Sequence, residues 1–460
     1  MFSTRRQACG AIAGGVVAGG ASPGQDAAAI NKELAEKNAR LVHTAHPGAQ
    51  WYPEAGLGLF VHWGLASVHG SIDLSWGMMH GMGKGTKITP EEYFRLAERF
   101  QPDKWAPDRM LEAAKAAGFR YAVLTAKHHE GFALWPSAYG EFNTGKYAGG
   151  RDLVRAFVEG CRKHGLKAGL YYSPGDWYYS RDVMSFNYRS AHCWQTTGLT
   201  CRPELPDYNT RFEPVSLPPR SAEWEAKYRA YQRGQITELL TRYGKLDLLW
   251  FDMATVVMTP DEIRTLQPAI VINNRMGGGT GDFLTPEGEF PKTRPEGWWE
   301  LCTIWNSPNW GYVKSNEERY APLGRIVSTL ARTRAWGGNL LLNVGPRSDG
   351  SMPKPYWDGT KELSEWMQRC GRALFNVTAG GWPESSNTPV TISGRTWYFH
   401  VQAGSGGTIV EAKAPSRPKM AVLLRTGKEL AVGFSEGGLR IEVPGEARTE
   451  PGEVIAVDFA

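Results

Sequence analysis

Short apolar runs alternate with amphipathic helical stretches along most of the chain. Runs that are apolar on both faces are typical of buried strands, and they lie at 56–64, 120–129, 167–173, 245–252, 269–275, 297–304 and 339–346. Apolar residues at helical spacing predict helices near 27–42, 89–100, 107–117, 150–165, 222–243, 260–267, 317–335 and 356–375. Strands separated by helices form parallel sheets covered on both faces, so this pattern predicts an α/β fold built as a (β/α)8-like TIM barrel.

The pattern changes beyond about residue 380. Short alternating runs divided by Gly, Pro and Ser follow, and they predict a C-terminal antiparallel β-sandwich. We therefore place a barrel domain at 29–380 and a sandwich domain at 381–460. Within the barrel, residues 173–220 form a Pro- and aromatic-rich insertion that is longer than an ordinary connection, which favours a functional loop.

The first 28 residues have the order of an export signal peptide. A twin arginine, Arg5-Arg6, precedes a weakly apolar Ala, Gly and Val stretch and then small residues, as in signals of the twin-arginine type. That stretch is too short and too Gly-rich to span a bilayer, and no other segment has the length of a transmembrane helix. We therefore expect a bacterial protein that is periplasmic or secreted. In an oxidising compartment, Cys193 and Cys201 are close enough in sequence to form a disulfide.

The composition and residue spacing argue against a nucleic-acid-binding protein and against a zinc protein. The net charge of +5 includes the basic N-terminus, and no Lys/Arg-rich stripe occurs elsewhere, so nucleic acid is not an expected partner. No Cys/His spacing resembles a zinc site. The chain has 18 tryptophans, many of them beside Gly, His or Asp, and a surface that stacks on carbohydrate would need such residues.

Polar or aromatic side chains follow nearly every predicted strand. The chemistry of an α/β barrel collects at the carboxyl ends of its strands, which gives these positions their weight. They hold His62 and Trp63, His128 and His129, Tyr171 and Tyr172, Trp250 and Asp252, Asn274 and Arg275, and Glu300. One such group is commonly a cap or a satisfied core residue, but their recurrence from strand to strand favours a site that binds a polyol.

Asp252 is the most informative of these residues. It ends a run that a parallel sheet would bury, where a carboxylate is costly unless donors hold it or it has a chemical role. The structural alternative is an N-cap of the next segment. Asp247 begins the same run, so we expect it at the opposite end of the barrel in a structural role.

Seven stretches, in this order, resemble the α-L-fucosidases of glycoside hydrolase family 29. They are "GLGLFVHWG", "TAKHHEGFALW" with "GRDLV" downstream, "GLYYSPGDW", "LLWFD", "INNR", "TPE" and "GGNLLLNVGPRSDG", and they cover about residues 50–380. The resemblance implies a retaining exo-glycosidase on a (β/α)-barrel with a C-terminal β-sandwich, acting on terminal α-L-fucose in fucosylated glycans. It implies no cofactor and no metal, because two carboxylates suffice for this chemistry.

The resemblance also assigns roles to residues at the strand ends. Asp252 matches the catalytic nucleophile, and Arg275 matches an arginine that binds near it, a cation that would favour the ionised carboxylate. The positions that match residues contacting the sugar are His62, Trp76, His128, His129, Tyr172 and Trp250, with Tyr171 the less favoured of the two tyrosines. A neutral imidazole offers one donor and one acceptor, which suits a hydroxyl.

The general acid/base is expected on the loop after the arginine strand, with its carboxyl about 5–5.5 Å from the nucleophile. Glu287 is the positional match. Glu289 is a competitor because loop alignments slip, and Glu300 is another because the pattern places it at the end of its own strand.

One position departs from the family. Many members carry a Glu-Trp pair in the loop after the first strand, and this chain has Ser75-Trp76 there. Trp76 can still stack on a sugar, whereas the carboxylate would have to come from Asp73 or from the long insertion. L-fucose remains the favoured sugar, and a related sugar such as L-galactose is the alternative.

Two other functions compete with this interpretation. A metal-dependent barrel hydrolase could use His62, His128, His129 and Asp252 as ligands, and insensitivity to chelators would argue against it. A non-catalytic protein that binds fucosylated glycans could retain the scaffold, with Ser75 as a sign of lost activity. Binding without turnover would support that second alternative.

Overall fold

The computed structural model describes residues 41, 43–82, 88–189, 204–253, 256–277 and 279–460. The expected export signal, the helix predicted near 27–42 and the Cys193–Cys201 pairing lie outside these residues. In the described part of the chain, no helix is long and apolar enough to cross a membrane.

Eight parallel strands form the N-terminal domain, and their order in the sheet is their order in the chain. They are β1 (Leu57–Val61), β2 (Tyr121–Lys127), β3 (Lys167–Tyr172), β6 (Leu248–Phe251), β7 (Val271–Ile272), β8 (Phe283–Leu284), β9 (Trp298–Ile304) and β10 (Asn339–Val344). β1 pairs with both β2 and β10, and a parallel bridge between Asn273 and Phe283 joins β7 to β8. The ring is therefore closed, and the predicted barrel fold is confirmed.

Helices cover most of the barrel. They are α3 (Ala66–His69), α4 (Pro90–Arg95), α5 (Pro107–Ala116), α6 (Thr144–Tyr147), α7 (Leu153–Lys163), α9 (Ala222–Arg242), α10 (Pro260–Leu266), α11 (Leu323–Ala335) and α12 (Lys354–Cys370). Between β7 and β9 the described residues contain only the short 3-10 turn η5 (Asn274–Met276) and β8. On this side of the barrel, loops therefore lie directly against the strands.

Local sequence explains where two helices begin. Thr89 and Glu92 form a reciprocal capping box that starts α4, as the pattern predicts. The helix predicted from residue 317 begins instead at Leu323, directly after Pro322. Proline disfavours helical geometry in the residue before it, so the helix cannot extend through that point.

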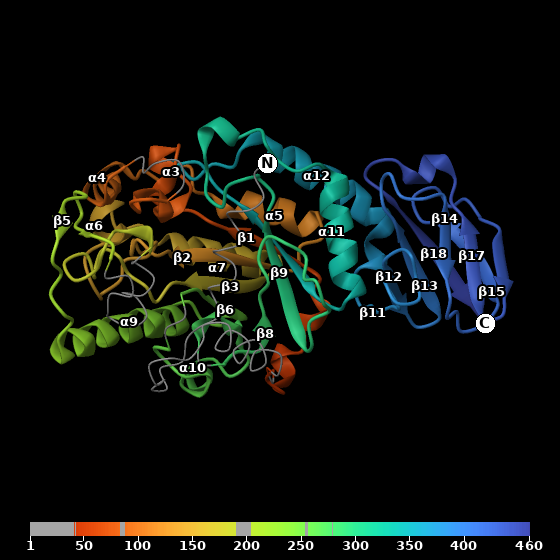
Figure 1. Ribbon diagram of the computed structural model, residues 1–460, viewed down its shortest axis with the longest axis horizontal. Helices are drawn as coiled ribbons and strands as arrows, with labels where there is room; N and C mark the ends of the chain where they lie inside the picture. Colours follow the sequence, from red (N-terminus) through yellow and green to blue (C-terminus); the bar gives the residue numbers. More distant parts are fainter. Residues whose placement is uncertain (1–40, 42, 83–87, 190–203, 254–255, 278) are drawn as a thin grey trace.

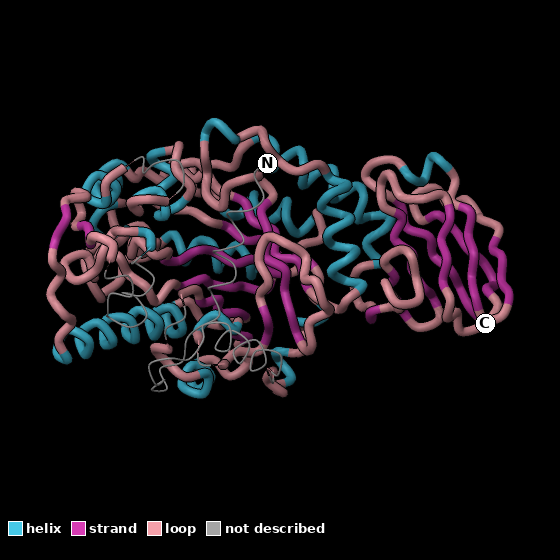
Figure 2. Tube along the Cα trace, viewed as in Figure 1, coloured by secondary structure: helices cyan, strands magenta, loops and turns pink. Residues whose placement is uncertain are grey.

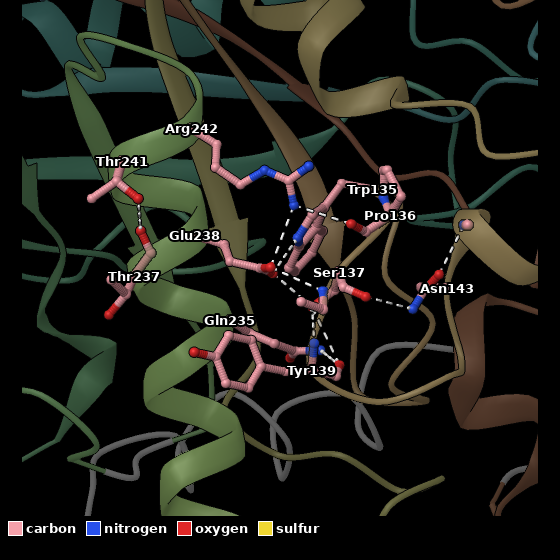
Figure 3. A network of polar contacts seen from close by, with 12 residues as sticks. Trp135, Pro136, Ser137, Tyr139, Asn143, Gln235, Thr237, Glu238, Thr241 and Arg242 are labelled. Carbon is pink, nitrogen blue, oxygen red and sulfur yellow. Dashed lines mark hydrogen bonds and ion pairs between the residues drawn. The ribbon is translucent and has the colours of Figure 1, made fainter.

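The loop after β2 is anchored to the outer helix α9. Glu238 of α9 accepts hydrogen bonds from the Trp135 indole at 2.9 Å, the Ser137 hydroxyl at 2.6 Å and the Ala138 backbone N–H at 2.9 Å (Figure 3). Arg242, one helical turn further, donates to the Pro136 carbonyl at 3.0 Å. These bonds fix the segment that follows His128 and His129.

The C-terminal domain is an antiparallel β-sandwich, as predicted. One sheet has the order β11 (Thr378–Ala379), β12 (Val390–Ser393), β13 (Thr396–Val401), β18 (Glu453–Phe459) and β15 (Pro418–Leu423). The other has the order β14 (Thr408–Glu411), β17 (Gly438–Glu442) and β16 (Val432–Ser435). Apolar side chains from both sheets share one core, and α11 and α12 lie between this domain and the barrel strands (Figures 1 and 2).

Candidate active site

Asp252 lies at the carboxyl end of β6, where the backbone turns sharply. The next residue, Met253, has a positive φ of 66°, which is uncommon for a residue with a side chain. This turn brings the Met253 N–H to 3.0 Å from Asp252 Oδ1. Strained backbone of this kind often occurs at functional sites, because the surrounding structure must hold it in place.

One guanidinium group contacts two carboxylates. Arg275 Nη1 lies 3.4 Å from Asp252 Oδ1, and Arg275 Nη2 lies 2.8 Å from Glu287 Oε2. Burial opposes the charge of Arg275, but Glu287, Cys302 and Asp252 outweigh it and raise the pKa of the guanidinium above its usual value. The two acids are 21% and 33% exposed, so both are within reach of a ligand from solvent.

Glu287 reaches the site because its loop forms a parallel bridge to Cys302 of β9. Cys302 N–H donates to the Pro286 carbonyl at 3.0 Å, and Gly288 N–H donates to the Cys302 carbonyl at 2.9 Å. Glu289, two residues further, is exposed and forms no ion pair with Arg275 among the described residues. Of these two glutamates, Glu287 is the one that shares the Arg275 guanidinium with Asp252.

Glu300 does not end its strand, and that expectation is wrong. β9 continues to Ile304, and Glu300 pairs in register with Asn339, the first residue of β10. Its side chain is fully buried in the barrel interior, well below the carboxyl edge. Burial raises the pKa of this carboxyl to about 7, although hydrogen bonds from Tyr121, Trp250 and Tyr52 act in the opposite direction.

The two adjacent histidines lie on the same side of the chain. β2 ends at Lys127, and its register with β3 shifts between Thr125 and Lys127, so the alternation of faces is broken just before them. The ring centroids of His128 and His129 are 3.9 Å apart. Both rings can therefore contact one ligand.

Hydrogen bonds fix the tautomers of two histidines. His62 Nδ1 lies 2.6 Å from Asn343 Oδ1, and Asn343 Nδ2 donates to the Trp310 carbonyl, so Nδ1 of His62 carries the proton. His129 Nδ1 lies 2.7 Å from Ser173 Oγ, whose proton goes to the Gly175 carbonyl. In the neutral rings, Nε2 is then left as an acceptor in both.

Electrostatics keep His62 in that neutral state. Burial, and then the neighbouring His128, lower the pKa of His62 to about 3. In the neutral form of His129, its Nε2 is an acceptor that lies 3.7 Å from Asp252 Oδ2. This arrangement suits a ligand hydroxyl that donates a proton.

Ser75 is buried behind His128. Its hydroxyl lies 2.8 Å from His128 Nδ1, and Glu130 Oε2 lies 3.3 Å from the same nitrogen. The carboxylate beside this histidine therefore comes from Glu130, which sequence reasoning missed although it follows the histidine pair directly. Asp73 Oδ1 accepts from the Trp310 and Gly311 N–H groups, so it anchors a loop and is not placed to substitute for the missing acid.

Of the two adjacent tyrosines, Tyr171 and not the favoured Tyr172 faces the site. Tyr171 donates its hydroxyl proton to Asp252 Oδ2 at 3.1 Å. Tyr172 lies outside the ring of strands, where its hydroxyl contacts Lys127 Nζ at 3.1 Å and Gln235 Oε1 at 3.0 Å. Tyr171 thus belongs to the site, and the prediction that Tyr172 contacts the sugar is wrong.

Three tryptophans surround the polar groups. Trp250 is buried beneath the Arg275 guanidinium, whose carbon lies 4.7 Å from the ring centroid. Its ring face is therefore covered, and the prediction that Trp250 packs on the sugar is wrong. Trp76 is half-buried, with its ring edge-on to His129 at 5.2 Å. Trp310, also half-buried, lies 5.2 Å from His62. Sequence reasoning missed Trp310, although it follows a strand in the aromatic-rich segment after β9.

The histidines do not form a metal centre with Asp252 in this structure. Among the residues that the structure describes, no group of three or more His, Cys, Asp and Glu side chains is arranged to hold a metal ion. The Nδ1 atoms of His62, His128 and His129 are each within hydrogen-bond distance of a side chain. The arrangement is suited to binding hydroxyl groups.

A pair of carboxylates at the carboxyl edge of a β/α barrel, with acceptors for sugar hydroxyls around them, defines a glycoside hydrolase. Comparison with known proteins gives the particular family. The family model for α-L-fucosidase matches residues 25–372, so the chain belongs to the α-L-fucosidases of glycoside hydrolase family 29.

Individual relatives agree with this assignment. The chain is 30% identical to tissue α-L-fucosidase of Bos taurus over 72% of this chain and 69% of that protein. It is similar in structure to α-L-fucosidase isoenzyme 1 of Paenibacillus thiaminolyticus, with a TM-score of 0.74 and 28% identity over 90% of this chain and 99% of that one. The Thermotoga maritima α-fucosidase, solved in complex with a mechanism-based inhibitor, gives a TM-score of 0.68 and 25% identity over 90% and 97% of the two chains.

Proposed function

We propose that this α-L-fucosidase family member is a retaining exo-glycosidase that releases terminal α-L-fucose from glycans by double displacement. Asp252 is the nucleophile and Glu287 is the acid/base. The observation that carries the assignment is the single guanidinium of Arg275 in contact with both carboxylates. The inhibitor complex of the Thermotoga maritima relative, described as mechanism-based, supports a shared mechanism.

The two steps use the two acids in turn. In the first, Glu287 gives its proton to the glycosidic oxygen while an Asp252 oxygen attacks the anomeric carbon, which forms a covalent β-fucosyl-enzyme and releases the aglycone. In the second, Glu287 removes a proton from water, and that water displaces Asp252 to give α-L-fucose. Arg275 and the Tyr171 hydroxyl stabilise the Asp252 charge before attack and after release.

The histidines favour a sugar with several donor hydroxyls. Nε2 of His62 and of His129 are acceptors, and Trp76 and Trp310 offer rings beside them. L-fucose fits this chemistry, and L-galactose differs from it only by a hydroxyl on the carbon outside the ring. L-galactosides are therefore the second candidate substrates.

Hydrolysis of an aryl α-L-fucoside by the purified chain, with and without EDTA, tests the proposal. We expect turnover that the chelator does not change, because the two carboxylates perform the chemistry. Activity that EDTA abolishes would point to the metal-dependent alternative. Binding without turnover would favour the glycan-binding alternative, and a faster reaction with the matching aryl α-L-galactoside would change the substrate.

Substitution of the two neighbouring tyrosines separates catalysis from stability. Tyr171→Phe removes a hydrogen bond to a charged group, so we expect kcat to fall by about 10- to 100-fold. Tyr172→Phe removes the hydrogen bond to the buried Gln235 Oε1 and one acceptor of Lys127, which keeps its ion pair with Asp176, so we expect a loss of about 1–3 kcal/mol in unfolding free energy with kcat little changed. Steady-state kinetics and denaturant unfolding measure the two effects, and a larger kcat loss in Tyr172→Phe would contradict the placement.

We also propose that the chain is exported. Arg5-Arg6 and the small-residue stretch after them support this proposal. Replacement of both arginines by lysine should leave the full-length protein in the cytoplasm, as cell fractionation of a bacterial host can measure. Export that is unchanged by this substitution would contradict a twin-arginine route.

A further inference from the structure

Trp250 forms a floor beneath the charged groups of the site. The Arg275 guanidinium carbon lies 4.7 Å from the Trp250 ring centroid, and the Tyr171 ring stacks on the same side chain with centroids 5.5 Å apart and planes 20° apart. Both neighbours contact the Asp252 carboxylate, Arg275 through Nη1 and Tyr171 through its hydroxyl. The position of one indole ring therefore affects both side chains that orient Asp252.

Glu300 holds that ring from below. The Trp250 indole N–H donates to Glu300 Oε1 at 3.0 Å. An indole has one polar atom, so this hydrogen bond is the directional restraint on the ring. The other carboxyl oxygen of Glu300 accepts from the hydroxyls of Tyr121 and Tyr52. Tyr52 belongs to η2 (Tyr52–Glu54), which precedes β1 in the chain.

A carboxyl group is an unusual filling for this part of the barrel. The interior of such barrels is normally packed with branched apolar side chains, and a buried acid is costly there. Glu300 is nonetheless fully buried. Its two oxygens accept from three donors at once, which the single oxygen of an amide does less well. Among the described residues, its link upward to the site passes through Trp250.

We propose that Glu300 is a positioning residue that orients the nucleophile through Trp250, an inference that rests on the proposed role of Asp252. Glu300 lies below Trp250 and does not touch the substrate. In the proposed function the sugar hydroxyls are bound by His62 and His129, which follow the other strands β1 and β2. Loss of the Glu300 restraint should therefore reduce the rate of attack and leave binding nearly unchanged, because attack requires the reacting atoms about 3–3.5 Å apart.

Kinetics of Glu300→Gln with an aryl α-L-fucoside, beside Tyr52→Phe as a matched control, test this proposal. The Gln side chain has one acceptor oxygen in place of two and cannot accept from the indole N–H and both tyrosine hydroxyls at once, so we expect kcat to fall by about 10- to 100-fold with KM changed by less than about threefold. Tyr52→Phe removes a donor to the same carboxyl but leaves the bond to Trp250, and it should retain kcat. A similar fall in both variants, or a change in KM alone, would overturn the proposal.

Trp250→Phe provides a second route that does not depend on the folding of Glu300→Gln. It keeps an aromatic floor but removes the indole N–H, so kcat should fall with KM retained, and the double variant should be no slower than the slower single variant. An unchanged kcat in Trp250→Phe would contradict the proposal that Glu300 acts through Trp250. A double variant whose fall in kcat is the product of the two single falls would contradict it as well.

A crystal structure of Glu300→Gln gives a readout without activity. The proposal requires a displaced Trp250 ring and Arg275 guanidinium, and unchanged positions would overturn it. If the unaltered chain hydrolyses no aryl α-L-fucoside, the proposed function fails, whereas the displacement in this crystal structure still decides whether Glu300 positions the site.

Discussion

Asp252→Ala is expected to lower kcat for an aryl α-L-fucoside by at least about 10³-fold, because no other carboxylate in the described part of the chain can form the covalent intermediate from the same position. Glu287 is tied to the far side of the Arg275 guanidinium, and Glu300 is buried below Trp250. The loss should be of similar size for activated and for poor leaving groups, since both need the nucleophile. Steady-state and single-turnover kinetics measure it.

Two controls make this experiment specific. Asp252→Asn keeps the size of the side chain and should lose a comparable amount of activity, which separates the missing charge from a packing defect. Thermal unfolding should show that both variants are folded. Azide added to Asp252→Ala should restore turnover by attacking the anomeric carbon directly, with β-L-fucosyl azide, the inverted configuration, as product. Full activity in Asp252→Ala, or azide products of retained configuration, would exclude Asp252 as the nucleophile.

The barrel could be predicted from the sequence because the patterns that indicate its strands and helices each lie within a short stretch of the chain. Strand runs and helical spacing lie within short windows, and the caps and prolines that bound helices act on neighbouring residues. The start of α11 at Leu323 could have been anticipated from Pro322. β8 was missed because it has two residues, Phe283 and Leu284, within a Gly-rich segment, and it is a strand through its pairing with β9 and not through its own pattern.

The tyrosine error shows what local evidence lacks. Adjacent residues of a strand face opposite sides, and the register between strands decides which residue faces inward. Tyr171 is the register partner of Trp250, and Tyr172 is the partner of Phe251. Partners in neighbouring parallel strands share a face, so Tyr171 must point inward with Trp250. That pairing involves residues about eighty positions apart and was not readable from either run alone.

Glu130 and Trp310 were missed for a different reason. Their importance comes from loops that meet above the barrel: Glu130 approaches His128 from the turn after β2, and Trp310 approaches His62 from the loop after β9. The pattern could place each loop at the carboxyl edge, but it could not show which loop side chains turn toward the histidines. Ser75 is another such residue. The sequence showed only that it replaces the glutamate of many family members, whereas the structure shows that its hydroxyl contacts His128.

Glu287→Ala should show a loss of activity that depends on the leaving group. With a poor leaving group the first step needs the acid, so we expect kcat/KM to fall by about 10²- to 10⁴-fold. With a dinitrophenyl fucoside the aglycone departs without protonation, the first step is nearly unchanged, and hydrolysis of the fucosyl-enzyme becomes rate-limiting. Azide needs no general base, so it should accelerate turnover and give α-L-fucosyl azide, the retained configuration.

Glu289→Ala is the matched control for this prediction, because Glu289 lies two residues away in the same loop and is exposed. A surface substitution of this kind should change kcat/KM by less than about threefold. If Glu289→Ala, and not Glu287→Ala, showed the dependence on leaving group and the azide rescue, the acid/base would be Glu289, and the contact of Glu287 with Arg275 would be structural. The opposite azide stereochemistry expected for the Asp252 and Glu287 variants assigns the two roles independently, because only a nucleophile variant can give the inverted product.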